Sequence, residues 1–83
     1  METYQMTREI MFKRIRALRK REHYTQTEMA DRLGISRRTY ANYERGIHAM
    51  PVEVLVVIAD LFGTSLDYLT GRNASFSEVR ALQ

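Results

Sequence analysis

The stretch that decides the fold of this chain is Gln26-Thr-Glu-Met-Ala-Asp-Arg-Leu-Gly-Ile-Ser-Arg-Arg-Thr-Tyr-Ala-Asn-Tyr-Glu-Arg45. It predicts two short helices joined by a tight turn. Thr25 is the predicted N-cap of the first helix, and Glu28 stands three residues later, so these two residues can form a capping box. An apolar stripe follows at helical spacing and consists of Met29, Ala30 and Leu33. Gly34 then allows the left-handed backbone conformation that ends a helix.

The second helix of this stretch carries similar signals. Ser36 is its predicted N-cap, and Tyr40 and Tyr43 form its inward stripe. Ile35 is the apolar residue of the turn, which we expect to be buried. Gly46 marks the end of the segment.

Steric requirements support a crossed pair of helices here. A pair that crosses steeply over a short turn needs a small residue at the crossing, a glycine in the turn and apolar inner faces. Ala30, Gly34 and Ile35 meet these requirements. The chain resembles the helix-turn-helix of the phage-repressor-like (Xre/Cro-type) transcriptional regulators in four motifs, which are Thr25-Gln26, Met29-Ala30, Leu33-Gly34-Ile35-Ser36 and Tyr43-Glu44-Arg45-Gly46. The resemblance implies a compact, all-α, five-helix lambda-repressor-like DNA-binding domain.

The helices are expected to form one domain over residues 7–71. The first helix spans about residues 7–21, and Thr7 is its candidate N-cap. Residues 1–6 lack periodicity, and we expect them to fray. The 83 residues of the chain suffice for one such domain with a single modest core.

The fourth helix is predicted over residues 52–62, which are nearly all apolar. Its many β-branched residues also allow a buried strand, but Pro51 before it and Gly63 after it favour a helix. Thr64 or Ser65 then caps a short fifth helix that runs to the next glycine. The segment between residues 60 and 71 also resembles the end of the repressor domain.

The C-terminal residues 72–83 have a pattern of their own. Ser75 and Glu78 can form a capping box, and the apolar residues Phe76, Val79 and Leu82 recur every third position. This predicts a short amphipathic helix that docks on its own domain or on a partner. A disordered tail is the alternative, because so short a helix is not stable alone.

Composition excludes several classes of protein. The chain has no cysteine, which excludes a disulfide framework and a cysteine-ligated zinc site. No apolar run approaches about 18 residues, and no signal-peptide pattern opens the chain. We therefore expect a cytoplasmic, nucleoid-associated protein with no membrane partner. No nucleophile–base spacing, glycine-rich phosphate loop or metal-ligand cluster is found, so we expect no enzymatic activity, cofactor or metal site.

Charge is distributed unevenly along the chain, whose net charge is +3. Residues 1–23 carry +4, residues 24–50 carry +1 and residues 51–83 carry −2. The basic part therefore lies in and before the helix pair. Such asymmetry favours an anionic partner on one side of the molecule, although a merely solvated helix face is the alternative.

In a helix-turn-helix the second helix enters the major groove by its N-terminal half. The outward residues of the second helix are Arg37, Arg38, Ala41 and Asn42. Arginine can bond guanine and asparagine can bond adenine, while alanine admits the helix or touches a thymine methyl group. The resemblance implies that Arg37, Arg38 and Asn42 read bases. For either arginine, a contact with phosphate alone is the alternative.

Contacts with the phosphate backbone are expected from residues that flank the base-reading ones. These are Thr25, Gln26, Thr39, Arg45 and His48. Gln26 heads its helix, where an amide and the helix N-terminus can hold a phosphate, and the resemblance implies this role. His48 lies in a loop that has Ile47 and Ala49 where relatives are richer in Lys and Arg, so a surface histidine without a ligand is the alternative.

The resemblance also implies a partly buried salt bridge between Arg19 and Glu44. Arg19 lies late in the first helix, and Glu44 ends the recognition helix. Removing one partner of a truly buried pair costs about 3–5 kcal/mol. Glu44 is therefore predicted to be a structural residue, not a catalytic one.

Double-stranded DNA is the expected partner, bound by a homodimer at an inverted-repeat operator. Two recognition helices about 34 Å apart would then face one side of the duplex. The candidate dimer interface consists of Val57, the fifth helix and the tail residues Phe76, Val79 and Leu82, and the protein would act as a repressor. A single exposed valine is the alternative for Val57. An antitoxin-type or antagonist-bound regulator, whose main partner is another protein, is the alternative function.

Overall fold

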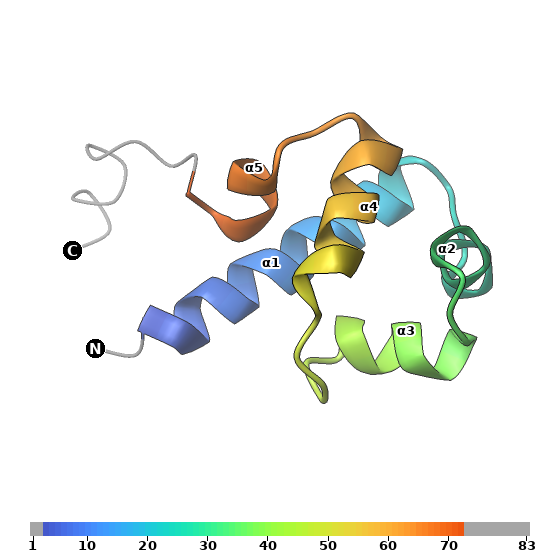
Figure 1. Cartoon of the computed structure of the whole chain (residues 1–83), viewed down its shortest axis with the longest axis horizontal. Helices are drawn as coiled ribbons and strands as arrows, with labels where there is room; N and C mark the ends of the chain where they lie inside the picture. Colours follow the sequence, from blue (N-terminus) through green and yellow to red (C-terminus); the bar gives the residue numbers. More distant parts are fainter. Residues whose placement is uncertain (1–2, 73–83) are drawn as a thin grey trace.

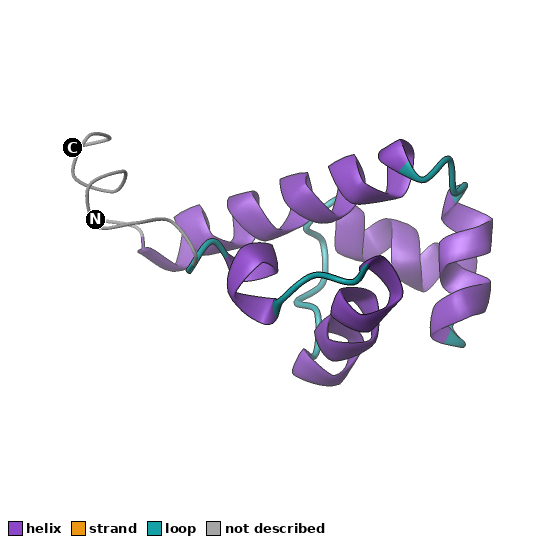
Figure 2. Cartoon of the chain, turned by 90° about the horizontal axis from the view of Figure 1, so that it is seen from above, coloured by secondary structure: helices purple, strands orange, loops and turns teal. Residues whose placement is uncertain are grey.

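The computed structural model describes residues 3–72 and folds them into five helices without a strand. The helices are α1 (Thr3–Arg21), α2 (Gln26–Leu33), α3 (Arg37–Glu44), α4 (Val52–Phe62) and α5 (Leu66–Thr70). The long α1 packs on α3 and α5, while α2 packs on α3 and α4 (Figure 1). Figure 2 shows that only short loops join the helices. The predicted all-α, five-helix architecture is confirmed.

Helix α1 begins earlier than predicted. It starts at Thr3, so Thr7 lies inside the helix and is not its N-cap. Neither proline nor glycine interrupts residues 1–10. Once the core face of α1 has nucleated the helix, each further residue towards the N-terminus adds one hydrogen bond, and an N-cap is not needed for this extension.

The helix-capping predictions for α2 and α3 are confirmed. The Glu28 N–H donates to Thr25 Oγ1 at 3.0 Å, and the Thr25 N–H donates to Glu28 Oε1 at 2.9 Å, which completes the capping box. Ser36 Oγ accepts from the Thr39 N–H at 3.0 Å and caps α3. Gly34 has a φ of 72°, so this glycine ends α2 in the left-handed region.

Each helix contributes one fully buried large side chain to the core. These side chains are Ile15, Met29, Tyr40, Ile58 and Leu69, in helix order. The core therefore requires all five helices at once, as expected for a small domain with a single hydrophobic cluster. Ile35, in the turn between α2 and α3, is only half-buried but packs against this cluster.

Two contacts fasten the C-terminal end of the described chain to α1. The Arg14 guanidinium lies 4.3 Å from the centre of the Tyr68 ring and donates to the Tyr68 carbonyl oxygen. Gly71 has a φ of 84°, and a Cβ added there would lie 2.9 Å from Ile10 Cγ2. Glycine is therefore required at Gly71 both for the backbone conformation and for the close approach of α5 to α1.

Residues 52–62 form the predicted helix α4 and not the buried strand that was the alternative. Pro51 precedes it with an extended backbone, and Gly63 ends it with a φ of 63°. Ser65, one of the two candidates, caps α5 by accepting from the Tyr68 N–H at 3.0 Å. The predicted tail helix, with Phe76, Val79 and Leu82, lies outside the described residues.

Candidate nucleic-acid interface

Helix α3 has one half that faces the core and one half that does not. A helix turns about 100° per residue, which sets Arg37, Arg38, Ala41 and Asn42 on one half and Tyr40, Tyr43 and Glu44 on the other. Tyr40, Tyr43 and Glu44 are buried. Arg37 and Arg38 are exposed, and Ala41 and Asn42 are half-buried. All four predicted base-contact residues thus share the half of α3 that the core does not use.

The carboxylate of Glu44 joins three helices. Arg19 of α1 donates from Nε to Glu44 Oε2 at 2.7 Å and from Nη2 to Oε1 at 3.3 Å. Gln26 of α2 donates from Nε2 to Oε1 at 3.2 Å. Tyr40, one turn earlier on α3, donates its hydroxyl to Oε2. Arg19 also donates from Nη1 to the Tyr24 carbonyl oxygen at 2.8 Å, so the guanidinium is bonded on both sides.

These bonds fix the charge states of the network. Burial alone would raise the pKa of Glu44, but the hydrogen bonds from Arg19, Tyr40 and Gln26 outweigh burial and hold this pKa below its ordinary value. The hydrogen bond to Glu44 raises the pKa of Arg19, and burial raises the pKa of Tyr40. Glu44 is therefore a charged acceptor with no proton to give, which suits a structural role.

Three of the predicted phosphate contacts already serve the fold. Gln26 is half-buried and directs one amide N–H to Glu44, which leaves the second N–H of the same nitrogen for a ligand. Thr25 and Thr39 both lie at helix N-termini, where Thr25 caps α2 and Thr39 Oγ1 accepts from Ser36 Oγ at 2.8 Å. Each threonine hydroxyl keeps its own hydrogen for donation.

The other two predicted phosphate contacts follow α3 in the sequence. Arg45 is the C-cap of α3 and is exposed, as is His48 in the loop that leads to α4. This loop is tied to α1, because Arg8 Nη2 donates to the Gly46 carbonyl oxygen at 2.5 Å. Phe12 lies beneath the same contact, with the Arg8 guanidinium 5.5 Å from its ring centre. The start of the loop is therefore held in one place against α1.

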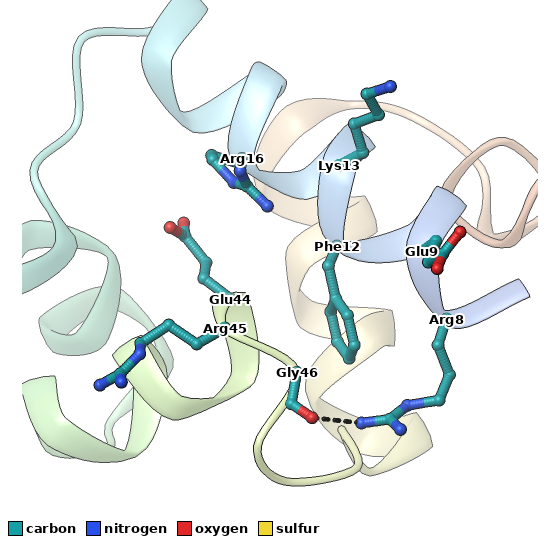
Figure 3. Close-up of a pocket in the computed structure, with 8 residues that line it drawn as sticks. All are labelled: Arg8, Glu9, Phe12, Lys13, Arg16, Glu44, Arg45 and Gly46. Carbon is teal, nitrogen blue, oxygen red and sulfur yellow. Dashed lines mark hydrogen bonds between the residues drawn. The ribbon is translucent and has the colours of Figure 1, made fainter. Parts of the chain in front are cut away.

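A hollow of about 450 Å³ lies between α1 and the C-terminal end of α3. Its lining residues are Arg8, Glu9, Phe12, Lys13, Arg16, Glu44, Arg45 and Gly46. Figure 3 shows Arg16 and Glu44 facing the space between the two helices, while Lys13 extends away from it. The hollow thus borders the network around Glu44 and has a mainly basic lining.

Comparison with known protein families identifies the family to which this five-helix chain belongs. A family profile described as helix-turn-helix matches residues 15–69, which include α2, α3 and α4, the C-terminal part of α1 and most of α5. The chain belongs to the phage-repressor-like helix-turn-helix family. Helices α2 and α3 are therefore the two helices of its helix-turn-helix, and the members that the chain resembles are regulators of transcription.

Individual relatives agree with this family. The chain is 44% identical over 59 residues to the HTH-type transcriptional regulator AnsR of Bacillus subtilis, an alignment that covers 71% of this chain and 51% of AnsR. It is 46% identical over 57 residues to RstR, a cryptic phage transcriptional repressor of Vibrio cholerae, over 69% of this chain and 51% of RstR. The chain spans about half the length of the curated relatives that it matches. No solved structure gives a significant match.

Two features of this helix-turn-helix domain were not predicted from the sequence. The first feature is the pair of hydrogen bonds that Gln26 and Tyr40 donate to Glu44. The second feature is the basic hollow lined by Arg16. Tyr40 and Glu44 are four residues apart on one helix, a spacing that could have indicated their contact. Nothing in the sequence pattern indicates that Gln26 reaches Glu44.

Over residues 3–72, no helix is long and apolar enough to cross a membrane. The same part of the chain contains no group of three or more His, Cys, Asp or Glu side chains placed to hold a metal ion.

Proposed function

We propose that this helix-turn-helix protein binds double-stranded DNA sequence-specifically and represses transcription. The observation that carries the proposal is the division of α3 into two halves. Tyr40, Tyr43 and Glu44 fasten one half to the core, and the other half presents Arg37, Arg38, Ala41 and Asn42. Arginine and asparagine are the side chains that form bidentate hydrogen bonds with guanine and adenine in the major groove.

Phosphate contacts would hold the recognition helix in register. Gln26 keeps one amide N–H after bonding Glu44. Thr39 lies in the first turn of α3, and the other three residues flank α2 or α3, namely Thr25, Arg45 and His48. Phosphate contacts position a protein on the duplex and carry no sequence information themselves. Repression is supported by RstR, whose name describes a phage transcriptional repressor.

A selection from random duplexes tests the proposal. The purified protein is incubated with a pool of random DNA, and the enriched sites are sequenced. The double variant Arg38→Ala, Asn42→Ala is expected to lose at least about 30-fold in affinity for the selected site, because each bidentate contact is worth about 1–3 kcal/mol. Arg72→Ala, an exposed arginine beyond α5, serves as the control and should select the same site.

The operator is proposed to be an inverted repeat bound by a homodimer. Helix α4 leaves Val52, Val56 and Val57 exposed at 61%, 42% and 44%, which provides an apolar surface for a second copy. Phe76, Val79 and Leu82 remain proposed contributors. Sedimentation at micromolar concentration should give a dimer that Val57→Lys shifts towards monomer. A wild-type monomer under these conditions contradicts the proposed dimer.

The alternative is a regulator whose main partner is another protein, as in antitoxins. The exposed valines of α4 are the observation in its favour, since a foreign protein could cover them equally well. If the random pool yields no enriched duplex at low or physiological salt, the DNA-binding proposal fails. A search for a protein that binds the α4 surface would then be the next experiment.

A further inference from the structure

A basic trough runs between α1 and the end of α3. The hollow of Figure 3 adjoins a second one of about 440 Å³, and the two share Arg16, Glu44 and Arg45. We call the pair the α1–α3 trough. Its cationic residues are Arg8, Lys13, Arg16, Arg19, Lys20 and Arg45, and Gln26 lines its far end. Gln26 and Arg45 are also proposed phosphate contacts, so the trough continues from the proposed DNA-binding face.

Three cations of the trough have charges that the protein does not neutralise locally. Arg16, Lys20 and Arg45 are exposed, and none of them has an ion-pair partner within residues 3–72. The carboxylate of Glu44 lies in the trough but is already paired with Arg19 at 2.7 Å. The trough therefore has an excess of positive charge, which favours a polyanionic ligand.

The trough also has a fixed shape. Arg8 bonds the Gly46 carbonyl oxygen and lies over Phe12, which fastens the α3–α4 loop to α1 at one end. The network around Glu44 fastens α1, α2 and α3 to one another at the other end. Arg16 and Lys20 are one helical turn apart on α1, so both side chains project from the same face of a rigid helix. A prearranged row of cations loses little entropy when a ligand binds.

We propose that the α1–α3 trough binds the sugar-phosphate backbone of duplex DNA, with Arg16 and Lys20 as phosphate-binding residues. This inference rests on the proposed DNA-binding function and extends the phosphate contacts from α2 and α3 to α1. One strand of DNA presents a phosphate about every 3.4 Å along the duplex axis. The 1.5 Å rise per residue puts Arg16 and Lys20 about 6 Å apart along α1, so the two cations can reach different phosphates of one strand.

The test is the dependence of DNA affinity on salt concentration. The probe is a random-sequence duplex of about three helical turns, about 30 base pairs, titrated between about 50 and 200 mM salt. The trough variant is Arg16→Gln, Lys20→Gln, and its matched control is Arg21→Gln, Arg72→Gln. Both double variants remove two positive charges at exposed positions, so each has a net charge of +1 where the wild type has +3.

The logarithm of the DNA association constant falls as the logarithm of the salt concentration rises. The trough variant is expected to make this negative slope shallower by about 1.8, because each lost phosphate contact reduces its magnitude by about 0.9. The control should change the slope by less than about 0.5. The charge-preserving variant Arg16→Lys, Lys20→Arg should keep the wild-type slope. Circular dichroism of each variant establishes that the helices are intact.

Two results would overturn the inference, and they differ in whether the proposed DNA-binding function also fails. Equal changes of slope in the trough variant and its control would mean that only net charge matters. If the wild type nevertheless enriches a specific site that Arg38→Ala, Asn42→Ala loses, the proposed function stands and only the trough fails. Absence of wild-type binding to any duplex at low salt would remove both proposals together.

Discussion

Replacement of Glu44 by glutamine is expected to lower the free energy of unfolding by about 3 kcal/mol. Glutamine keeps the shape of the side chain, removes its charge and replaces one of its two acceptor oxygens with an amide donor. The Arg19 guanidinium would then remain in the protein without its counter-ion. Removal of one partner from a buried pair is costly because it leaves an uncompensated charge behind.

The expected magnitude follows from the burial of the pair and its remaining bonds. The side chains of Arg19 and Glu44 are 12% and 4% exposed, so the pair is shielded from water. Arg19 keeps its bond to the Tyr24 carbonyl oxygen in the variant, which favours the lower end of the range of about 3–5 kcal/mol. For a domain of this size, a loss of about 3 kcal/mol lowers the melting temperature by about 15 °C.

Urea unfolding followed by circular dichroism at neutral pH measures this loss. The matched control is Glu22→Gln, because Glu22 pairs with Arg21 at 3.4 Å on the surface, and the control should change stability by less than about 0.5 kcal/mol. A double-mutant cycle with Arg19→Met completes the experiment. The coupling between Arg19 and Glu44 should reach at least about 1.5 kcal/mol.

Two outcomes would refute this reasoning. A loss below about 1 kcal/mol for Glu44→Gln would mean that the carboxylate does not hold the three helices together. A large loss without coupling to Arg19 would show that the cost arises elsewhere, for example at the Tyr40 hydroxyl.

Further predictions concern pH and backbone conformation. The pKa of Glu44 in the folded protein lies below its ordinary value of 4.5, so the unfolded state binds the proton more readily. The stabilisation from Glu44 is therefore present above pH 4.5 and is lost as the pH falls through the pKa of the folded state. Over this acidic range, the urea midpoint of the wild type should drop more steeply than that of Glu44→Gln. Gly71→Ala should destabilise the domain more than Gly34→Ala. Both residues have a positive φ, but only at Gly71 does the new Cβ meet a neighbour, Ile10; equal losses in thermal melts would contradict this contact.

The helix-turn-helix itself could be predicted because its signals are local. Thr25 and Glu28 are three residues apart, and Gly34 directly follows the apolar stripe of α2. Hydrogen bonds over such short distances form wherever the helix forms, so the sequence pattern suffices. The start of α1 has no comparable signal, which is why the predicted start at Thr7 was wrong.

The network around Glu44 depends on contacts that the sequence does not encode locally. Arg19 and Glu44 are separated by 25 positions, and their pairing was implied by the family resemblance and not by the pattern of charges. The Gln26 bond joins residues 18 positions apart and was not predicted. Both contacts exist only because the core brings α1, α2 and α3 together.

The same limit applies to the α1–α3 trough. Arg16 and Lys20 belong to a helix whose polar face, judged from the sequence alone, could equally be solvated. Their significance arises from Arg45, which the packing of α3 on α1 brings to the same hollow. Residue types and spacing within one helix cannot indicate such a neighbour.

The division of α3 into a half that is buried in the core and a half that is not has a consequence for how related proteins can diverge in sequence. Tyr40, Tyr43 and Glu44 are buried and stabilise the fold, whereas Arg37 and Arg38 are exposed. If the protein binds DNA as proposed, substitutions at Arg37 and Arg38 should therefore alter the preferred DNA sequence with almost no loss of stability. A duplicated copy of such a gene could acquire a new operator in single mutational steps, each of which leaves a folded protein.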